Sequence, residues 1–149
     1  MSPTQRLFPM LAYEDGPAAM DWLCEAFGFR EVTRWVGEDG LLAHGELALG
    51  DETVMLATPT PEYRSPKRHR DECEQARRWS EVPYVIDGVC VYVEDVDAHF
   101  ERARGAGATI LSEPADQPGA GIRHYRAEDL EGHRWMFAQE LRGSGQEER

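Results

Sequence analysis

The chain has 149 residues, with 16 Lys and Arg against 28 Asp and Glu, and a formal net charge of −12 at pH 7. This charge argues against nucleic acid as a partner, because phosphate backbones are bound by clustered lysine and arginine. No stretch approaches the roughly 18 apolar residues of a membrane helix, and the N-terminal MSPTQRLFPM lacks the pattern of a secretory signal. We therefore expect a cytoplasmic protein with no membrane partner.

The first half, residues 7–58, predicts a strand, a helix and three more strands. The apolar run 7–13 is typical of a short strand. Asp15 suits a helix N-cap and Gly28 suits the left-handed position after a helix. Between them, apolar residues recur with the spacing of an amphipathic helix: Ala19, Trp22, Leu23, Ala26 and Phe27. Three strands then follow, over residues 30–37, 41–49 and 52–58, separated by glycine-containing turns.

Residues 59–83 differ from their surroundings, because they are rich in proline and arginine and too long for an ordinary connection. This segment is interpreted as an insert, either a linker between two halves or a flap over a site. A short helix is predicted inside it, over residues 70–79.

The second half, residues 84–141, repeats the first. Glu94-Asp95 before its helix matches Glu14-Asp15, and Gly132-His133 before its last strand matches Gly50-Asp51. Strands are predicted over 84–93, 108–114, 121–129 and 133–140, and residues 142–149 are predicted to be a disordered tail. An internal repeat determines an architecture more firmly than a single element does. The predicted fold class is α+β, with two tandem βαβββ units forming a curved sheet around a cavity and helices on the outer face.

Four stretches carry a resemblance to a known superfamily: AYEDGPAAMDWLCEAFGF, AHGELALGDETVML, VYVEDVDAHFERARGAGA and YRAEDLEGHRWMFAQ. Their order is similar to that of the vicinal-oxygen-chelate superfamily, which includes glyoxalases, extradiol dioxygenases, fosfomycin-resistance enzymes and bleomycin-resistance proteins. The resemblance implies one such domain over residues 1–149. It also implies a homodimer, because the binding cavities of the bleomycin-resistance branch form across two copies.

Members of this superfamily that bind a metal carry His, Glu or Gln at four inward positions. Matched through the glycine turns, these positions are Phe8, Val54, Gly88 and Met136. Moving each by one residue gives Pro9, Met55, Asp87 or Trp135. Either set offers at most one carboxylate, whereas a catalytic metal needs about three protein ligands. The sequence therefore predicts no metal and no cofactor, and the alternative ligands for a divalent metal are His44, Glu46 and His124.

Aromatic, thioether and polar side chains on the predicted strands indicate a site for a small-molecule ligand. The predicted ligand-binding residues are Trp35, His44, Glu46, Tyr92, Trp135 and Met136. No catalytic residue is predicted, because the chain has no activated-serine or phosphate-loop motif. The first hypothesis is metal-independent sequestration of an aromatic or cationic compound, as in antibiotic resistance. The alternatives are a metal-dependent lyase, isomerase or dioxygenase, and an interaction module built on the insert.

Overall fold

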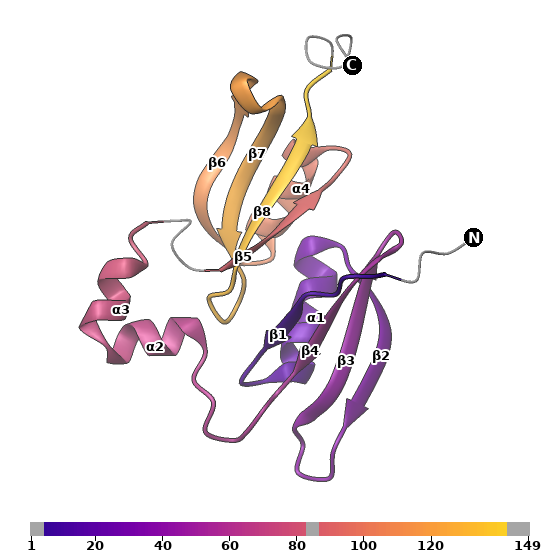
Figure 1. Cartoon of the computed structure of the whole chain (residues 1–149), viewed down its shortest axis with the longest axis vertical. Coiled ribbons are helices and arrows are strands. Elements are labelled where there is room, and N and C mark those ends of the chain that lie inside the picture. The colour runs from indigo at the N-terminus through magenta and orange to yellow at the C-terminus, as the bar shows by residue number, and fades with distance from the viewer. Residues whose placement is uncertain (1–4, 83–86, 143–149) are drawn as a thin grey trace. The chain divides into compact units, whose positions relative to one another are not determined.

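The computed structural model describes residues 5–82 and 87–142, which form two units of the same βαβββ design (Figure 1). Unit 1 spans Met1–Ser65 and unit 2 spans Pro66–Arg149. Each unit has its own four-stranded mixed sheet, so the predicted α+β class with tandem βαβββ units is confirmed. The predicted tail beyond Arg142 and the start of the predicted strand, residues 84–86, lie outside the described residues.

Unit 1 contains one helix and four strands. Its elements are β1 (Met10–Ala12), α1 (Gly16–Phe27), β2 (Arg30–Val36), β3 (Leu42–Leu49) and β4 (Glu52–Ala57). The sheet order is β1-β4-β3-β2, with β1 parallel to β4 and the other pairs antiparallel. The strands β2, β3 and β4 follow one another as antiparallel hairpins. The connection through α1 allows β1 to lie parallel to β4 at the edge of the sheet.

The ends of α1 are set by the two residues that the sequence indicates. The Ala18 backbone N–H donates to Asp15 Oδ1 at 3.1 Å, and Gly28 has a φ of 84° past the last turn. Met20, Leu23 and Phe27 on the apolar side of α1 are fully buried, whereas Trp22 is only partly buried. A Cβ added at Gly45 of β3 would lie 2.7 Å from Met20 Sδ, so the helix packs directly on the backbone of the sheet.

Unit 2 begins with the helical part of the insert and then repeats the pattern of unit 1. Its elements are α2 (Pro66–Glu72), α3 (Glu74–Trp79), β5 (Gly88–Tyr92), α4 (Val96–Gly105), β6 (Thr109–Gln117), the 3₁₀ turn Pro118–Ala120, β7 (Ile122–Glu128) and β8 (Arg134–Glu140). The sheet order is β5-β8-β7-β6, with β5 parallel to β8. The helix predicted over residues 70–79 is instead two helices, because Cys73 between them has an extended backbone, with φ −138° and ψ 114°.

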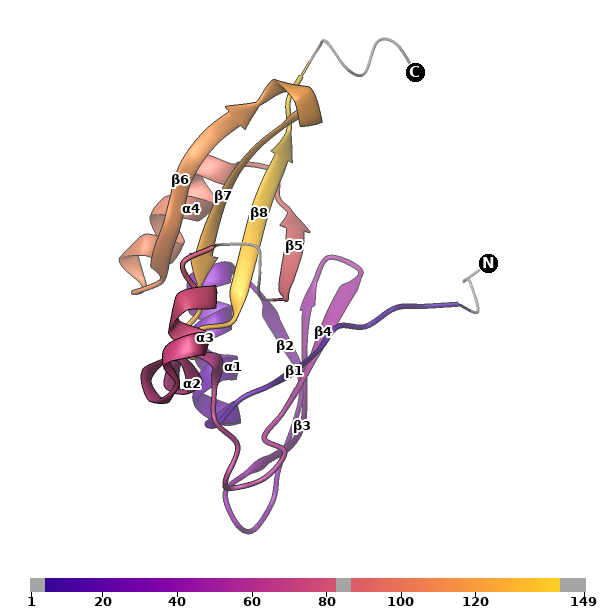
Figure 2. The same ribbon diagram turned by 60° about the vertical axis from the view of Figure 1, so that its left-hand side comes forward.

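In unit 2, α4 lies against one face of the sheet (Figure 2), and the buried side chains lie between the two. Asp95 caps α4 by accepting from the Ala98 backbone N–H at 3.0 Å. On the sheet side, the rings of Tyr125 and Phe137 are stacked 5.3 Å apart, and the Phe100 ring meets Tyr125 edge-on at the same distance. Such aromatic contacts hold α4 on one face of the sheet, so α4 does not cover the opposite face.

We call the face of each sheet opposite α1 or α4 its open face. Because side chains alternate along a strand, every second residue of β1–β4 and β5–β8 points to it. The predicted cavity between the two halves stays a prediction. The longest helix in the described residues is α1, with 12 residues, and none of the described helices is long and apolar enough to cross a bilayer.

Candidate functional site on the open faces

A row of four residues crosses the open face of unit 1. Backbone pairing joins Met10 of β1 to Met55 of β4, then Met55 to Glu46 of β3, and Glu46 to Thr33 of β2. Met10 is 78% exposed, although a methionine side chain is stabilised by burial. The row therefore presents two thioethers and one carboxylate on the face opposite α1.

Three predicted ligand-binding residues lie together on the next part of this face. His44 Nε2 lies 2.7 Å from Glu46 Oε2, and the imidazole of His44 is 5.3 Å from the indole of Trp35, centroid to centroid, at a tilt of 45°. The Trp35 side chain sits on β2 opposite His44 and is 64% exposed. The structure thus brings Trp35, His44 and Glu46 into one cluster that combines an aromatic surface with a hydrogen-bonding pair.

The corresponding row of unit 2 has a different charge. Cys90 of β5 pairs with Met136 of β8, Met136 with Arg126 of β7, and Arg126 with Ser112 of β6. Tyr92 lies two residues beyond Cys90 on the same face and is 56% exposed. The predicted residues Tyr92 and Met136 therefore belong to one face of the second sheet.

Strand pairing defines which residues of the two units are equivalent. Met55 and Met136 each pair with the parallel edge strand on one side and with the third strand on the other. Met55, and not Val54, is therefore the counterpart of Met136, which corrects the placement by glycine turns. Val54 pairs with the fully buried Leu47 and is itself buried. Met55 follows the turn glycine Gly50 by one residue more than Met136 follows Gly132, so counting from the turns gives the wrong face.

Trp135, which the sequence groups with Met136, lies in the core of unit 2. It is 1% exposed, its ring is stacked on Phe137 at 6.1 Å, and its indole Nε1–H donates to Asp129 Oδ2 at 3.1 Å. Neighbouring residues on a strand point to opposite faces, so Trp135 and Met136 do not share one. Trp135 therefore belongs to the core of unit 2 and not to its open face.

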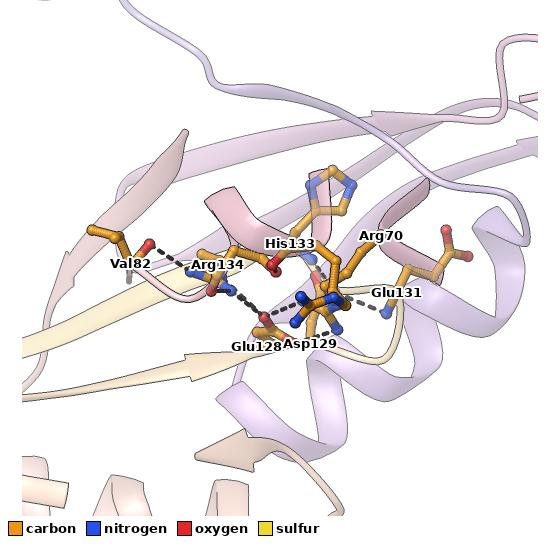
Figure 3. Close-up of polar contacts among 9 residues, drawn as sticks. Arg70, Val82, Glu128, Asp129, Glu131, His133 and Arg134 are labelled. Atoms are coloured by element: carbon orange, nitrogen blue, oxygen red, sulfur yellow. Dashed lines mark hydrogen bonds and ion pairs between the residues drawn. The ribbon is translucent and has the colours of Figure 1, made fainter. Parts of the chain in front are cut away.

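One end of the open face of unit 2 is covered by the insert (Figure 3). Glu128 accepts from Arg70 of α2 through both carboxylate oxygens, at 2.7 and 3.1 Å, and from Arg134 Nε of β8 at 2.9 Å. Arg134 also donates to the carbonyl oxygens of Ser80 and Val82, at 2.7 and 3.1 Å. We call Arg70, Glu128 and Arg134 the clasp. Glu128 and Arg134 are almost fully buried, so these charges depend on one another.

The turn between β7 and β8 supports the clasp. Asp129 accepts from the backbone N–H groups of Glu131 and His133, both at 3.0 Å, and so holds the turn in one conformation. The Lys67 backbone N–H donates to the Glu131 carbonyl at 3.0 Å, which joins the start of α2 to the turn. His133 is thus a turn residue, as its place after Gly132 predicts. The segment predicted as a linker or flap is fastened to this turn of unit 2.

Two titratable side chains of the second open face respond to their surroundings. Burial lowers the pKa of His124, and the positive charge of Arg126 lowers it further, so the neutral imidazole is favoured. His124 Nε2 lies 2.8 Å from Gln117 Oε1. Burial raises the pKa of Cys90, whereas Arg126 acts in the opposite direction. The environment of Cys90 is therefore not that of an activated thiolate nucleophile, which needs a lowered pKa.

The donor groups of the described residues do not fit a divalent metal. At the equivalent central positions of the two sheets stand Met55 and Met136, and a thioether suits only soft ions. His44 and Glu46 supply two ligands in unit 1, which is fewer than the three of a catalytic site. Within residues 5–82 and 87–142, no group of three or more His, Cys, Asp and Glu side chains is arranged to hold a metal ion.

The chain belongs to the Glyoxalase/Bleomycin resistance protein/Dioxygenase superfamily, whose family model matches residues 7–137. It is 34% identical over 140 residues to an uncharacterized protein of Mycobacterium bovis, a match that covers 91% of this chain and 84% of the relative.

Solved structures show the same fold. The chain is similar to TioX from Micromonospora sp. ML1, with 36% identity, a TM-score of 0.66, and coverage of 92% of this chain and 99% of TioX. It is also similar to TnmS3 from Streptomyces sp. CB03234, described as an antibiotic binding protein, with a TM-score of 0.59. That match has 17% identity and covers 93% of this chain and 99% of TnmS3, so it shows the fold alone.

Sequence reasoning did not select several residues that these faces bring forward. From the sequence, Met55 is considered only as a shifted metal position, because counting from Gly50 selects Val54, and Met10 was not selected at all. Arg126 follows the buried Tyr125 on β7, so the alternation of side chains along a strand places Arg126 on the opposite, open face. Together with the internal repeat, this alternation could have identified Arg126 from the sequence. Glu128 meets Arg70 across 58 residues of sequence, and no local pattern indicates such a pair.

Proposed function

We propose that this protein binds a planar aromatic small molecule on the open faces of its sheets, without a metal and without transforming it. The observation that carries the proposal is the exposed indole of Trp35, which lies beside the His44–Glu46 pair on the face that α1 leaves uncovered. An exposed aromatic platform bordered by a few polar groups is typical of a binding surface. A binder needs affinity for the ground state and no transition-state machinery.

The side chains around Trp35 suit an aromatic ligand that also carries positive charge. Met10 and Met55 are flexible and polarisable, so they can adapt to the edge of a ring. The Glu46 carboxylate would attract a cationic group, and the net charge of −12 raises the local concentration of cations. An aromatic ring gains from stacking on the indole, and a cationic ring gains further from the indole's negative face.

The comparisons support a biological role in sequestration. TnmS3, which shares the fold, is described as an antibiotic binding protein, and the superfamily includes bleomycin-resistance proteins. We propose that the chain holds a toxic or valuable natural product by stoichiometric binding in the cytoplasm. A homodimer, as implied for the bleomycin-resistance branch, is part of this proposal.

The proposal is tested by titrating the protein with N-phenyl-1-naphthylamine, an uncharged dye that fluoresces on apolar surfaces, and with the cation ethidium. We expect Trp35→Ala to weaken both by about tenfold, since aromatic contacts contribute about 0.5–1.5 kcal/mol beyond the buried area. Trp79→Ala is the matched control, because Trp79 is also exposed but lies on α3 of the insert. Dissociation constants that are the same for Trp35→Ala and the wild type would contradict the proposal.

A further inference from the structure

Arg126 occupies the middle of the open face of unit 2. It lies on β7 between Met136 of β8 and Ser112 of β6, and it is half-buried. Its neighbours in the strand, Tyr125 and Ala127, are fully buried on the α4 side. Arg126 is thus held by a rigid strand of the sheet, and strands position a binding group more firmly than loops do.

Arg126 differs from the other partly buried arginines in having no counter-charge. Arg34 pairs with Asp21 and Glu31, Arg123 with Asp97 and Asp116, and Arg70 and Arg134 share Glu128. The guanidinium of Arg126 makes no hydrogen bond and no ion pair with any of the described residues. A half-buried guanidinium has lost part of its hydration, so an unpaired one favours a partner that can accept its hydrogen bonds.

Two carboxylates on the strands β7 and β8 do not neutralise Arg126. Glu128 lies two residues along β7 on the same face, but both of its oxygens are occupied by Arg70 and Arg134. Glu140 stands at the far end of β8, beside Ile122, about 13 Å away along the strand at 3.3 Å per residue. This part of the face therefore has three arginines and one glutamate, in a chain of net charge −12.

The charge of Arg126 reaches the residues beside it. His124 lies two residues from Arg126 on the same face of β7, and Cys90 is the next residue but one in the row, beyond Met136. Burial lowers the pKa of His124 and the charge of Arg126 lowers it further, whereas burial raises the pKa of Cys90 and Arg126 opposes that rise. Both effects on His124 favour the neutral form of its imidazole. Tyr92 and Met136 provide aromatic and thioether surface on the same face.

We propose that Arg126 binds an anionic oxygen group, a carboxylate, sulfonate or phosphate, on an aromatic ligand that lies on the open face of unit 2. This inference rests on the proposed function and adds a second ligand group to it: the face of unit 1 suits a positive charge, and the face of unit 2 suits an anionic oxygen group on an aromatic compound. The guanidinium fork matches the spacing of two oxygens on one acid group, so the contact is directional as well as charged. Because the whole chain repels anions, the selectivity must come from this short-range contact.

The inference is tested with two dyes that differ by one group. The dye 8-anilinonaphthalene-1-sulfonate carries a sulfonate, and N-phenyl-1-naphthylamine is the same ring system without it. We expect Arg126→Gln to weaken sulfonate-dye binding by about tenfold or more, because hydrogen bonds between charged groups are the strong ones, and to change binding of the uncharged dye by less than twofold. Arg126→Lys should retain part of the sulfonate preference, since the charge remains but the fork is lost.

The control is Arg123→Gln, which removes an arginine of the same strand whose partners are Asp97 and Asp116. Its sulfonate-dye binding should match the wild type, and thermal melts should show that all three variants fold. Unchanged sulfonate-dye binding in Arg126→Gln, with weaker binding of both dyes in Trp35→Ala, would overturn this inference and leave the proposed function in place. Failure of the wild type to bind the sulfonate dye would contradict this inference, and failure to bind N-phenyl-1-naphthylamine and ethidium would contradict the proposed function.

Discussion

The two open faces are built on the same backbone and carry opposite charges at equivalent positions. Met55 in unit 1 and Met136 in unit 2 are central in both, each between a parallel edge strand and an antiparallel neighbour. Next to them, Glu46 in one sheet corresponds to Arg126 in the other, and both pair with the central methionine. A duplicated scaffold can thus keep its core and its thioethers while the two faces differ in the ligand groups they attract.

The β-turns before the last strands show a second difference between the units. Gly50 of unit 1 has a φ of 59° and open space where a side chain would be. Gly132 of unit 2 has a φ of 91°, and a Cβ there would lie 2.7 Å from the backbone nitrogen of Lys67. The insert therefore converts one of two equivalent turns into a packed junction. The Arg-rich insert is fastened to unit 2 by the clasp, which weakens its interpretation as a free interaction module.

The largest expected effect comes from breaking the clasp. Replacing Glu128 with Gln removes the negative charge that Arg70 and Arg134 share as their ion-pair partner. The buried Arg134 is then left without a counter-charge. Loss of one partner of a buried ion pair costs about 3–5 kcal/mol of unfolding free energy. Urea denaturation should show a lower midpoint with an unchanged slope. Glu74→Gln, which removes an exposed partner of Arg77, should leave the midpoint where it is. Equal midpoints for the two variants would show that the clasp does not hold the insert.

A smaller effect is expected from the two turn glycines, which are compared directly. Both glycines have a left-handed backbone conformation, and alanine in that conformation lowers the free energy of unfolding by about 1–2 kcal/mol. Gly132→Ala must also displace the backbone of Lys67, and such overpacking adds about 1–3 kcal/mol. The free energy of unfolding should therefore fall further for Gly132→Ala than for Gly50→Ala. Equal decreases in the free energy of unfolding for the two variants would mean that α2 can move away from the turn at no cost in stability.

The smallest effect concerns the charge on the second face. Arg126→Gln removes one of the two causes that lower the pKa of His124, so that pKa should rise. A lowered pKa in the folded state contributes stability that is present above the unfolded pKa and lost as the pH falls. The variant should lose less stability than the wild type between neutral pH and about pH 5. NMR titration of the imidazole measures the shift, with Arg123→Gln as control. An unchanged His124 pKa would place the Arg126 guanidinium away from that ring.

Local signals were sufficient to predict most of the fold. Asp15 and Gly28 mark the ends of α1, and the match between Glu14-Asp15 and Glu94-Asp95 predicts the second unit, because caps and turns act over a few residues. Part of the first face was also predictable, since His44 and Glu46 are two residues apart on one strand.

The rest depends on contacts that local patterns do not encode. A one-residue difference in the turns exchanges Val54 for Met55, and a shift of one residue reverses the face of a strand. Trp135 is aromatic, as residues of ligand sites often are. Because it is next to Met136 on β8, however, its side chain points to the opposite face of the sheet, which α4 covers. The clasp joins Arg70 to Glu128 over 58 residues, which only the folded chain brings together.

The central claim, binding without a metal, is tested most directly by one titration made before and after treatment with a chelator. N-phenyl-1-naphthylamine is added to the protein as purified without a metal column, and again after dialysis against EDTA, with elemental analysis of both samples. Metal-independent binding predicts the same dissociation constant in both samples. Loss of binding after chelation, with recovery on adding one equivalent of zinc, manganese, iron or nickel, would contradict it.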